Sequence, residues 1–288
     1  MDVCAIQSVM ATHKGRERIL IALALCDYLT AGQITRLLYA ASSYSFVRKE
    51  LNALVAKLDV VALPGRNAAL PTLYTLTGKG HSTVAAVGLG ETKRVRPTEE
   101  RDKAQNVLFV KHTIAVSDVL VSALLLAQHH PDIVLTRLYH ERSLKRKIYV
   151  QGNGRISCIE PDASLELTIN GQWSDFFHIE VYRTLPPADW RFTQKVQGYV
   201  TVVESGQHEQ LFGTPALSIA VFCQTPPMAV TLKQWTEETL QKINRPEQSE
   251  RFFFRSGDTA SASPEELFLT PFWQQPFSAA KTPLIVRE

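Results

Sequence analysis

The sequence lacks the cysteine and histidine patterns of disulfide-rich and zinc-binding proteins. Only four cysteines occur in 288 residues, and no two of them form a CxxC pair. The eight histidines contain no HxxxH pair either. Secreted disulfide scaffolds and structural zinc sites need such spacings. Their absence favours the reducing cytoplasm as the location of this protein. The cysteines are Cys4, Cys26, Cys158 and Cys223.

A membrane-spanning or signal segment is also missing near the N-terminus. Lys14, Arg16 and Arg18 precede an apolar run over 19–25, and Asp27 ends that run. A bilayer span needs about 20 apolar residues, and this pattern does not fit a secretory signal. We therefore expect a soluble cytoplasmic protein without a membrane partner.

Strong net charge is absent, but the charge is unevenly distributed. The whole chain carries a formal charge of +3. Residues 1–111 hold 15 Lys and Arg against 9 Asp and Glu, whereas residues 112–288 hold 16 against 19. A basic N-terminal part suits a polyanion such as double-stranded DNA. Ordinary surface variation is the alternative explanation.

Residues 1–90 have the element order of a winged helix. Helices are predicted over 16–28 and 31–39, the second capped by the hydroxyl of Thr30. The run SSYS at 42–45 is expected to cap a third helix, with Phe46 and Leu58 among its inward residues. Two β-prone runs, 60–63 and 72–76, then flank a basic loop, and a helix follows from about 78 to 87.

The third helix and the hairpin supply the candidate DNA contacts. The third helix would enter the major groove with its N-terminal side, and Arg66 would stand at the wing tip. Lys79 begins a helix, where a phosphate is favoured. A solvated helical face or a protein-interaction module is the alternative. The candidates are Ser43, Ser45, Arg48, Lys49, Arg66 and Lys79.

The rest of the chain predicts a charged linker over 91–106 and a second domain over 107–288. A long helix over about 107–130 could be a core helix or the seam of a homodimer. Strands and helices then alternate, which favours an α/β (α+β) fold with a mixed sheet. The tail from about 257 receives no assignment. Strands are predicted near 133–140, 146–150, 156–169, 173–183, 217–223 and 251–255, and helices near 189–204 and 231–243.

Two carboxylates flank a predicted hairpin in this second domain. Asn170-Gly171 is a strong turn signal, and residue 171 is the midpoint between Asp162 and Glu180. The register therefore places the two acids opposite each other. A divalent cation, Mg²⁺ or Mn²⁺, would relieve their repulsion and could activate water at a phosphodiester. A structural hairpin with exposed acids is the alternative.

Pro161-Asp162 and the strand containing Glu180 resemble the PD-(D/E)xK nuclease superfamily. Tyr182 stands where the superfamily has lysine. Arg183 is adjacent but should face the other side of the strand. The resemblance implies that Lys195 on the next helix could replace the missing lysine, helped by Gln194 and Tyr199. The implied catalytic residues are Asp162, Glu180 and Lys195, and the implied metal ligands are Asp162 and Glu180.

Several stretches together resemble the replication-relaxation family of plasmid and mobile-element proteins. Their order covers about 16–205 and implies a role in replication, relaxation or mobilisation. That family usually continues its Glu strand as Glu-x-Asp, so Tyr182 removes a second acid. His112 matches the family helix, although a lone histidine on an apolar helix is more often a core residue. The stretches are LYTLTGKG, KHTIAVSDVLVSAL, IEPDASLEL, FFHIEVYRT and RFTQKVQGYV.

Three functions remain open from the sequence. The first is a DNA-binding accessory protein with a degenerate nuclease-like domain. The second is an active metal-dependent endonuclease or nickase. The third is a scaffold for a relaxase, transposase or replication protein. A basic cluster counts against the third, because it offers the second domain its own phosphate contact: Arg142, Lys145, Arg146 and Lys147.

Overall fold

The computed structural model describes residues 13–67, 69–86, 96–144, 148–152 and 155–286. The chain divides into two compact units. Unit 1 comprises Met1–Gln128 with Thr136–Leu138, and unit 2 comprises His129–Leu135 with Tyr139–Glu288. These limits differ from the predicted ones (1–90, 91–106 and 107–288), because the long helix groups with the N-terminal part. The expected mixed α/β class is confirmed.

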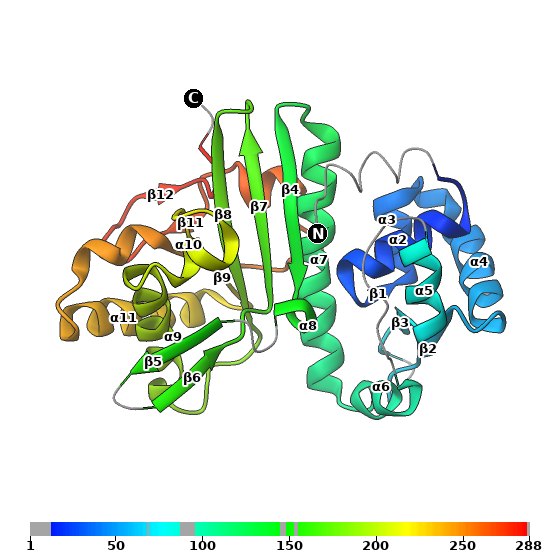
Figure 1. Cartoon of the computed structure of the whole chain (residues 1–288), viewed down its shortest axis with the longest axis horizontal. Helices are drawn as coiled ribbons and strands as arrows, with labels where there is room; N and C mark the ends of the chain where they lie inside the picture. Colours follow the sequence, from blue (N-terminus) through cyan, green and yellow to red (C-terminus); the bar gives the residue numbers. More distant parts are fainter. Residues whose placement is uncertain (1–12, 68, 87–95, 145–147, 153–154, 287–288) are drawn as a thin grey trace. The chain divides into compact units, whose positions relative to one another are not determined.

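Unit 1 begins with three helices and a small antiparallel sheet in the order β1-β3-β2 (Figure 1). The predicted helices and hairpin are confirmed to within a few residues. The elements are α2 (Arg16–Cys26), β1 (Leu29–Thr30), α3 (Ala31–Leu38), η1 (Ala41–Ser43), α4 (Tyr44–Ala56), β2 (Val60–Leu63), β3 (Leu73–Leu76), α5 (Gly78–Ala86), α6 (Pro97–Ala104) and α7 (Val107–His129).

The helix starts show which local signals decide the structure. The Thr30 hydroxyl accepts a hydrogen bond from the Gln33 backbone N–H at 3.1 Å, and the Gln33 side chain accepts one from the Thr30 N–H at 2.9 Å. This reciprocal capping box confirms the predicted cap. The expected serine cap on α4 is wrong, because Ser43 makes no side-chain capping bond. The 3₁₀ turn η1 leads into that helix instead.

Two expected core residues of α4 lie at the surface. Phe46 is 46% exposed, and Leu58 is 69% exposed. Phe46 packs one edge on the Tyr39 ring, at 5.6 Å between centroids, and leaves its other side to solvent. Leu58 follows the helix end with a φ of 63°, which turns the chain towards β2. The remaining seam, formed by Val47, Leu51 and Leu54, is buried as predicted.

The predicted linker contains the helix α6. Glu100 on α6 is 4% exposed, accepts a hydrogen bond from the Tyr28 hydroxyl and pairs with Lys103 at 3.1 Å. Ala104 and Val110 belong to the same buried cluster as Tyr28. This stretch is therefore anchored to unit 1 through Glu100 and Ala104, while the other residues of 96–106 are exposed, as their charge is typical of a solvated connection. Residues 91–95 lie outside the described part.

Helix α7 is long and apolar enough to cross a membrane by length and composition, but 61% of its most apolar stretch is buried in the protein. Its Asp118 accepts hydrogen bonds from the side chains of Gln33 and Arg36 on α3, each at 2.9 Å. A buried acid held in this way identifies a core helix rather than a lipid-facing one. This burial is consistent with the expected soluble protein, whereas the cytoplasmic location stays a prediction.

Unit 2 is built on a seven-stranded mixed sheet in the order β12-β11-β10-β9-β8-β7-β4. Strands β7 and β8 are antiparallel, and β8, β9 and β10 run parallel. The unassigned tail adds β11 and β12, the last two strands at one side of the sheet. The elements are β4 (Ile133–His140), α8 (Glu141–Leu144), β5 (Ile148–Gly152), β6 (Arg155–Ile159), β7 (Ala163–Ile169), β8 (Trp173–Tyr182), α9 (Asp189–Glu204), α10 (Gln207–Phe212), β9 (Ser218–Cys223), α11 (Pro226–Lys242), η2 (Pro246–Arg251), β10 (Phe252–Ser256), α12 (Pro264–Phe268), β11 (Trp273–Gln274) and β12 (Lys281–Thr282).

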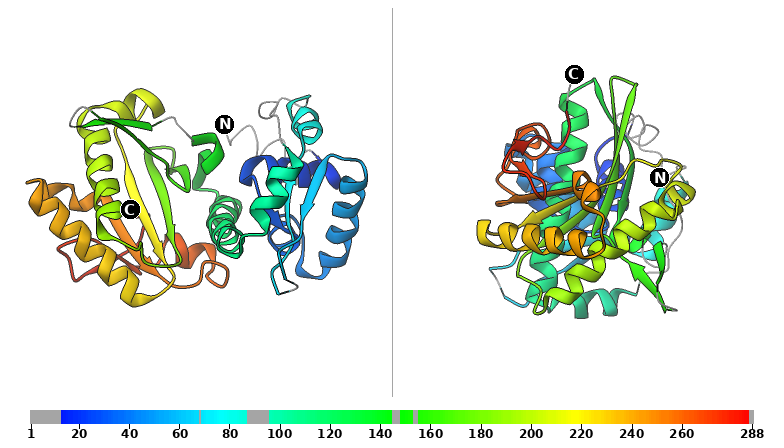
Figure 2. Two further views of the ribbon diagram at one scale, coloured as in Figure 1. Left: turned by 90° about the horizontal axis from the view of Figure 1, so that it is seen from below. Right: turned by 90° about the vertical axis from the view of Figure 1, so that its left-hand side faces the viewer.

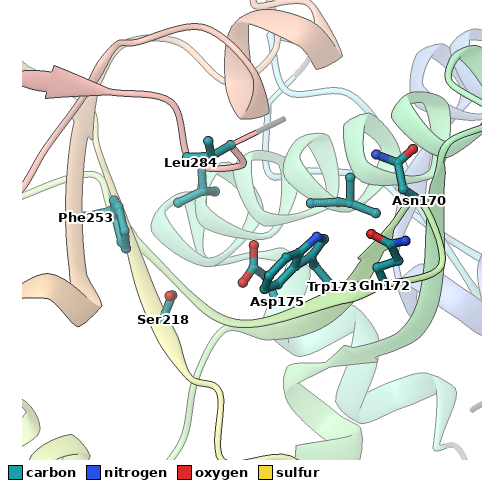
Figure 3. A pocket seen from close by; sticks show the side chains of 9 residues that line it. Asn170, Gln172, Trp173, Asp175, Ser218, Phe253 and Leu284 are labelled. Carbon is teal, nitrogen blue, oxygen red and sulfur yellow. The ribbon is translucent and has the colours of Figure 1, made fainter. Parts of the chain in front are cut away.

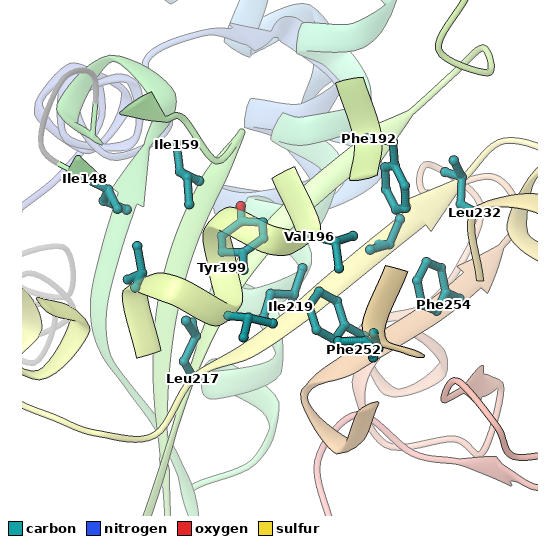
Figure 4. Packing of buried hydrophobic residues seen from close by; sticks show 14 of the residues in the cluster. Ile148, Ile159, Phe192, Val196, Tyr199, Leu217, Ile219, Leu232, Phe252 and Phe254 are labelled. Atoms are coloured by element: carbon teal, nitrogen blue, oxygen red, sulfur yellow. The ribbon is translucent and has the colours of Figure 1, made fainter. Parts of the chain in front are cut away.

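Helices α9 and α11 connect the parallel strands and lie together on one face of the sheet (Figure 2). Phe192 and Val196 of α9 pack with Ile219 of β9 and Phe252 of β10 in one buried cluster (Figure 4). Alternate residues of each strand point to this face. The packing fixes α9 against β8 and so determines which polar side chains of the two elements meet.

Candidate functional site

The β7–β8 hairpin places Asp162 opposite Glu180. Asn170 and Gly171 adopt positive φ angles of 52° and 67°, the conformation that Asn-Gly turns favour. Ala163 pairs with Ile179, and the Asp162 backbone N–H donates to the Ile179 carbonyl at 3.0 Å. The predicted register, centred on residue 171, is confirmed.

Glu180 is held by two side chains of α9. It is 3% exposed. Its Oε2 accepts a hydrogen bond from the Lys195 Nζ at 2.5 Å, and its Oε1 accepts one from the Tyr199 hydroxyl. Lys195 and Tyr199 are one turn apart and therefore share a face of the helix. Two of the three side chains that the sequence singled out on α9, Lys195 and Tyr199, thus reach the carboxylate on β8.

Asp162 lies at the start of β7, half-buried beside this cluster. Its Oδ2 accepts a hydrogen bond from the Val181 backbone N–H at 2.7 Å, which fixes the carboxylate at the edge of the hairpin. Its charge affects both Glu180 and Lys195. Asp162, Glu180, Lys195 and Tyr199 form what we call the acid–lysine cluster.

The electrostatics of the acid–lysine cluster are dominated by burial. Burial raises the pKa of Glu180 to about 7; the Lys195 charge opposes this rise, and the Asp162 charge adds to it. Burial alone would lower the pKa of Lys195, but the Glu180 and Asp162 carboxylates outweigh it and the pKa is raised. Near neutral pH, Lys195 is therefore charged while Glu180 exchanges a proton.

Tyr182 occupies the strand position where the nuclease pattern has lysine. Its ring packs on Phe192 with 5.6 Å between centroids. Burial raises the pKa of Tyr182, and the Glu180 and Asp162 charges raise it further, so the phenol stays neutral. Arg183 is the next residue on the chain and is half-buried, and Gln194 is exposed on α9. Among the described residues, neither makes a hydrogen bond or ion pair with the acid–lysine cluster.

The residues present do not fit a resident divalent cation. Both oxygens of Glu180 accept hydrogen bonds, and one oxygen of Asp162 does the same. No group of three or more His, Cys, Asp or Glu side chains that could hold an ion occurs in the described ranges. A magnesium or manganese ion would have to bind the remaining lone pairs of these carboxylates beside the Lys195 ammonium, whose positive charge repels it.

His178 lies buried behind the acid–lysine cluster. No motif in the sequence indicated this residue. Its Nδ1 is 2.5 Å from the Ser164 hydroxyl, and its ring lies 5.6 Å from that of Tyr199. Burial lowers the pKa of His178 well below its usual value, and His208 and Lys195 lower it further. The neutral ring therefore supports Tyr199 from behind. The alternation of FFHIEVY places His178 on the same face of the strand as Glu180. This alternation is the sequence signal that could have identified His178.

The candidate DNA contacts of unit 1 cluster on α4 and the β2–β3 loop. Ser45, Arg48 and Lys49 are exposed, Ser43 is half-buried, and Arg66 is exposed in the loop. In the part of unit 1 that the structure describes, no ion pair engages Arg48, Lys49 or Arg66. Their charges are therefore available to a polyanion.

Lys79 has a different environment. Its ammonium donates to the Lys57 carbonyl at 2.6 Å and pairs with Asp59 at 3.0 Å. The acid partly neutralises the charge that was expected to meet a phosphate. The ammonium also holds the turn between α4 and β2.

The remaining predicted features have simpler outcomes. Cys26 and Cys223 are buried free thiols, which fits the absence of a disulfide framework. His112 is half-buried on α7, and Arg142 is half-buried on α8. Other named residues lie outside the described residues or have side chains outside them: Cys4, Lys145, Arg146, Lys147 and Cys158.

Comparison with known protein families identifies a relationship. The replication-relaxation family model matches residues 20–215. This range begins within α2 and contains the following helices and the hairpin of unit 1, together with the whole acid–lysine cluster. No curated protein and no solved structure matches the chain.

Proposed function

The chain belongs to the replication-relaxation family, and we propose that it is a DNA-binding protein with a nuclease-like domain that does not cut DNA. Family membership indicates a role in replication or relaxation of mobile elements. The proposal adds that unit 1 binds duplex DNA of a plasmid or mobile element, and that the acid–lysine cluster is a degenerate nuclease centre.

The exposed N-terminal half of α4 carries the DNA-binding proposal. Arg48 and Lys49 stand side by side there without acidic partners among the described residues, and Ser45 lies on the turn before them. In a winged helix this part of the third helix enters the major groove. Arg66 in the β2–β3 loop would reach the neighbouring phosphates. Serine hydroxyls and basic side chains are common phosphate contacts.

A salt titration of binding tests this proposal. Gel shifts of a linear duplex should give an affinity that falls linearly in a plot of log K against log salt. Each phosphate contact contributes a slope of about −0.9, so contacts from Arg48, Lys49 and Arg66 predict a slope of about −3 or steeper. Absence of a shift at low salt, or an affinity that does not depend on salt, would contradict DNA binding.

The bonds at Glu180 support a centre that does not cut. The Lys195 ammonium and the Tyr199 phenol hydrogen-bond the Glu180 oxygens that a catalytic metal ion would need, the ammonium charge opposes a cation there, and Tyr182 takes the place of the usual lysine. The cluster then holds the hairpin and α9 together rather than activating water.

An active metal-dependent endonuclease or nickase is the second candidate. The contact of Lys195 with Glu180, next to Asp162, favours this candidate. Lys195 on α9 brings a positive charge to the two acids, as the strand lysine does in the nuclease pattern. This function requires the Lys195–Glu180 pair to open before the acids can bind Mg²⁺ or Mn²⁺.

Incubation with supercoiled plasmid discriminates the two. We expect the wild-type protein to leave the plasmid supercoiled in Mg²⁺ and in Mn²⁺. The Asp162→Ala variant should give the same result. If the wild type nicks or linearises the plasmid and Asp162→Ala does not, the centre is active and the second candidate replaces the first.

A further inference from the structure

A cavity of about 400 Å³ opens in unit 2, away from the acid–lysine cluster. Phe176 and Glu180 of β8 face α9. Successive residues of a strand point to opposite faces, so Trp173 and Asp175 face the other side of the sheet. Figure 3 shows Asp175 pointing into the cavity beside Trp173. The other lining residues come from the β7–β8 turn, β9, β10 and the C-terminal segment: Ile169, Asn170, Gln172, Ser218, Phe253, Leu284 and Val286.

Asp175 is a half-buried carboxylate that has no counter-ion among the described residues. None of the described lysines or arginines lines the cavity, and no hydrogen bond or ion pair of the Asp175 carboxylate is found within the same ranges. Burial raises the pKa of Asp175, which is the sign of a charge that has lost water and gained no partner. A cation entering the cavity would restore the lost stabilisation.

The walls of the cavity fit an organic cation. The indole of Trp173 is 60% exposed, and an aromatic face beside a carboxylate attracts cations through its quadrupole. Leu284 and Val286 offer apolar contact for an aliphatic stem. A phosphate group would be repelled by Asp175, so the DNA backbone does not suit this cavity.

We propose that this cavity binds the guanidinium group of an arginine side chain on a partner protein. A guanidinium is planar, stacks on an indole and pairs with a carboxylate through two parallel hydrogen bonds, whereas a lysine ammonium does not. The amides of Asn170 and Gln172 lie at the rim, where they can bind the main chain beside that arginine. The volume accommodates one long side chain and its flanking atoms.

The experiment measures binding of N-acetylarginine methylamide to the full-length protein by ligand-observed NMR. N-acetylcitrulline methylamide is the matched neutral probe, because it has almost the same shape without the charge. We expect the arginine probe to bind at least tenfold more tightly than the citrulline probe. Asp175→Asn should abolish this preference, and Trp173→Ala should weaken arginine binding severalfold.

Two controls make the outcome decisive. Glu209→Gln removes one exposed charge from α10 and should leave binding unchanged. Asparagine has nearly the same size as aspartate and carries no charge. The melting temperature of Asp175→Asn should therefore equal or exceed that of the wild type. The proposal is overturned if the two probes bind equally well, or if Asp175→Asn binds the arginine probe as the wild type does. It is also overturned if no binding is seen at 10 mM probe, on the order of the weakest affinity useful in an interface.

The chain itself offers one competing cation. Arg287 follows Val286 in the sequence and lies outside the described residues. If Arg287→Ala binds the arginine probe more tightly than the wild type does, the chain's own arginine competes for the cavity and the partner assignment fails. Unchanged affinity in Arg287→Ala supports an external partner.

Discussion

Replacing Glu180 with alanine is expected to lower the free energy of unfolding by about 3–5 kcal/mol. The substitution leaves the Lys195 ammonium and the Tyr199 hydroxyl without the oxygens that now accept their hydrogen bonds. The Lys195 side chain is 25% exposed, and a largely buried charge deprived of its partner is among the most destabilising defects in a protein interior. Urea denaturation monitored by tryptophan fluorescence gives the free energy.

Asp162→Ala serves as the comparison for this loss. Asp162 is half-buried and holds one backbone N–H, that of Val181. Its removal should lower stability by only about 1–2 kcal/mol. If Glu180→Ala is as mild as Asp162→Ala, Glu180 does not compensate Lys195 and the cluster does not hold the hairpin to α9.

The raised pKa of Glu180 adds a pH dependence with a definite sign. Its pKa is about 7 in the folded protein, against an ordinary value of 4.5, so the folded state binds the proton more tightly. The stability from this group is fully present below pH 4.5 and is lost as the pH rises towards 7. The slope for one proton is at most about 1.4 kcal/mol per pH unit.

Glu180→Gln isolates this effect, because glutamine resembles the protonated acid and does not titrate. We expect the wild type to lose stability relative to Glu180→Gln as the pH rises from 4.5 to 7. A difference that stays constant over this window, or a wild type that gains stability, would show that the ion pair with Lys195 outweighs burial.

Replacing Arg48 and Lys49 together with alanine should reduce the affinity for duplex DNA strongly at low salt. Two lost phosphate contacts reduce the slope of log K against log salt by about 1.8. The affinity should fall by about one to two orders of magnitude at 50 mM salt, an ionic strength at which each contact still releases counterions. Fluorescence anisotropy with a labelled duplex measures both quantities.

Lys242→Ala with Lys281→Ala is the charge-matched control. Both lysines are exposed in unit 2, so the double substitution removes the same net charge without touching α4. Its salt slope should remain that of the wild type. If the two double variants lose affinity equally, a general electrostatic attraction rather than α4 accounts for binding, and the winged-helix interpretation fails.

Local chemistry explains the features that could be predicted from the sequence. The Thr30 cap, the Asn170-Gly171 turn and the facing positions of Asp162 and Glu180 each depend on residues close together in the chain. Periods of two and of about 3.6 residues indicate strands and helices without any knowledge of the fold. Family resemblance then brought Lys195 and Tyr199 to attention from the next helix.

Long-range packing explains what the sequence did not indicate. The charged stretch containing Glu100 resembled a linker, but Tyr28, 72 residues away, buries that acid with a hydrogen bond. Phe46 fitted the apolar period of α4 and is exposed, because the Tyr39 ring covers only one of its sides. His178 gave no motif, since its neighbours come from a strand and two helices.

The sequence alone determined the mixed fold class, most elements, the hairpin register and the family resemblance, because these follow from short-range patterns. The tertiary structure alone decided that Glu180 is already held by Lys195 and Tyr199, and that no cation of the described residues lies beside Asp175. Which charges meet depends on the packing of α9 against β8 and of the C-terminal segment beside the sheet. Such contacts join residues that no local pattern connects.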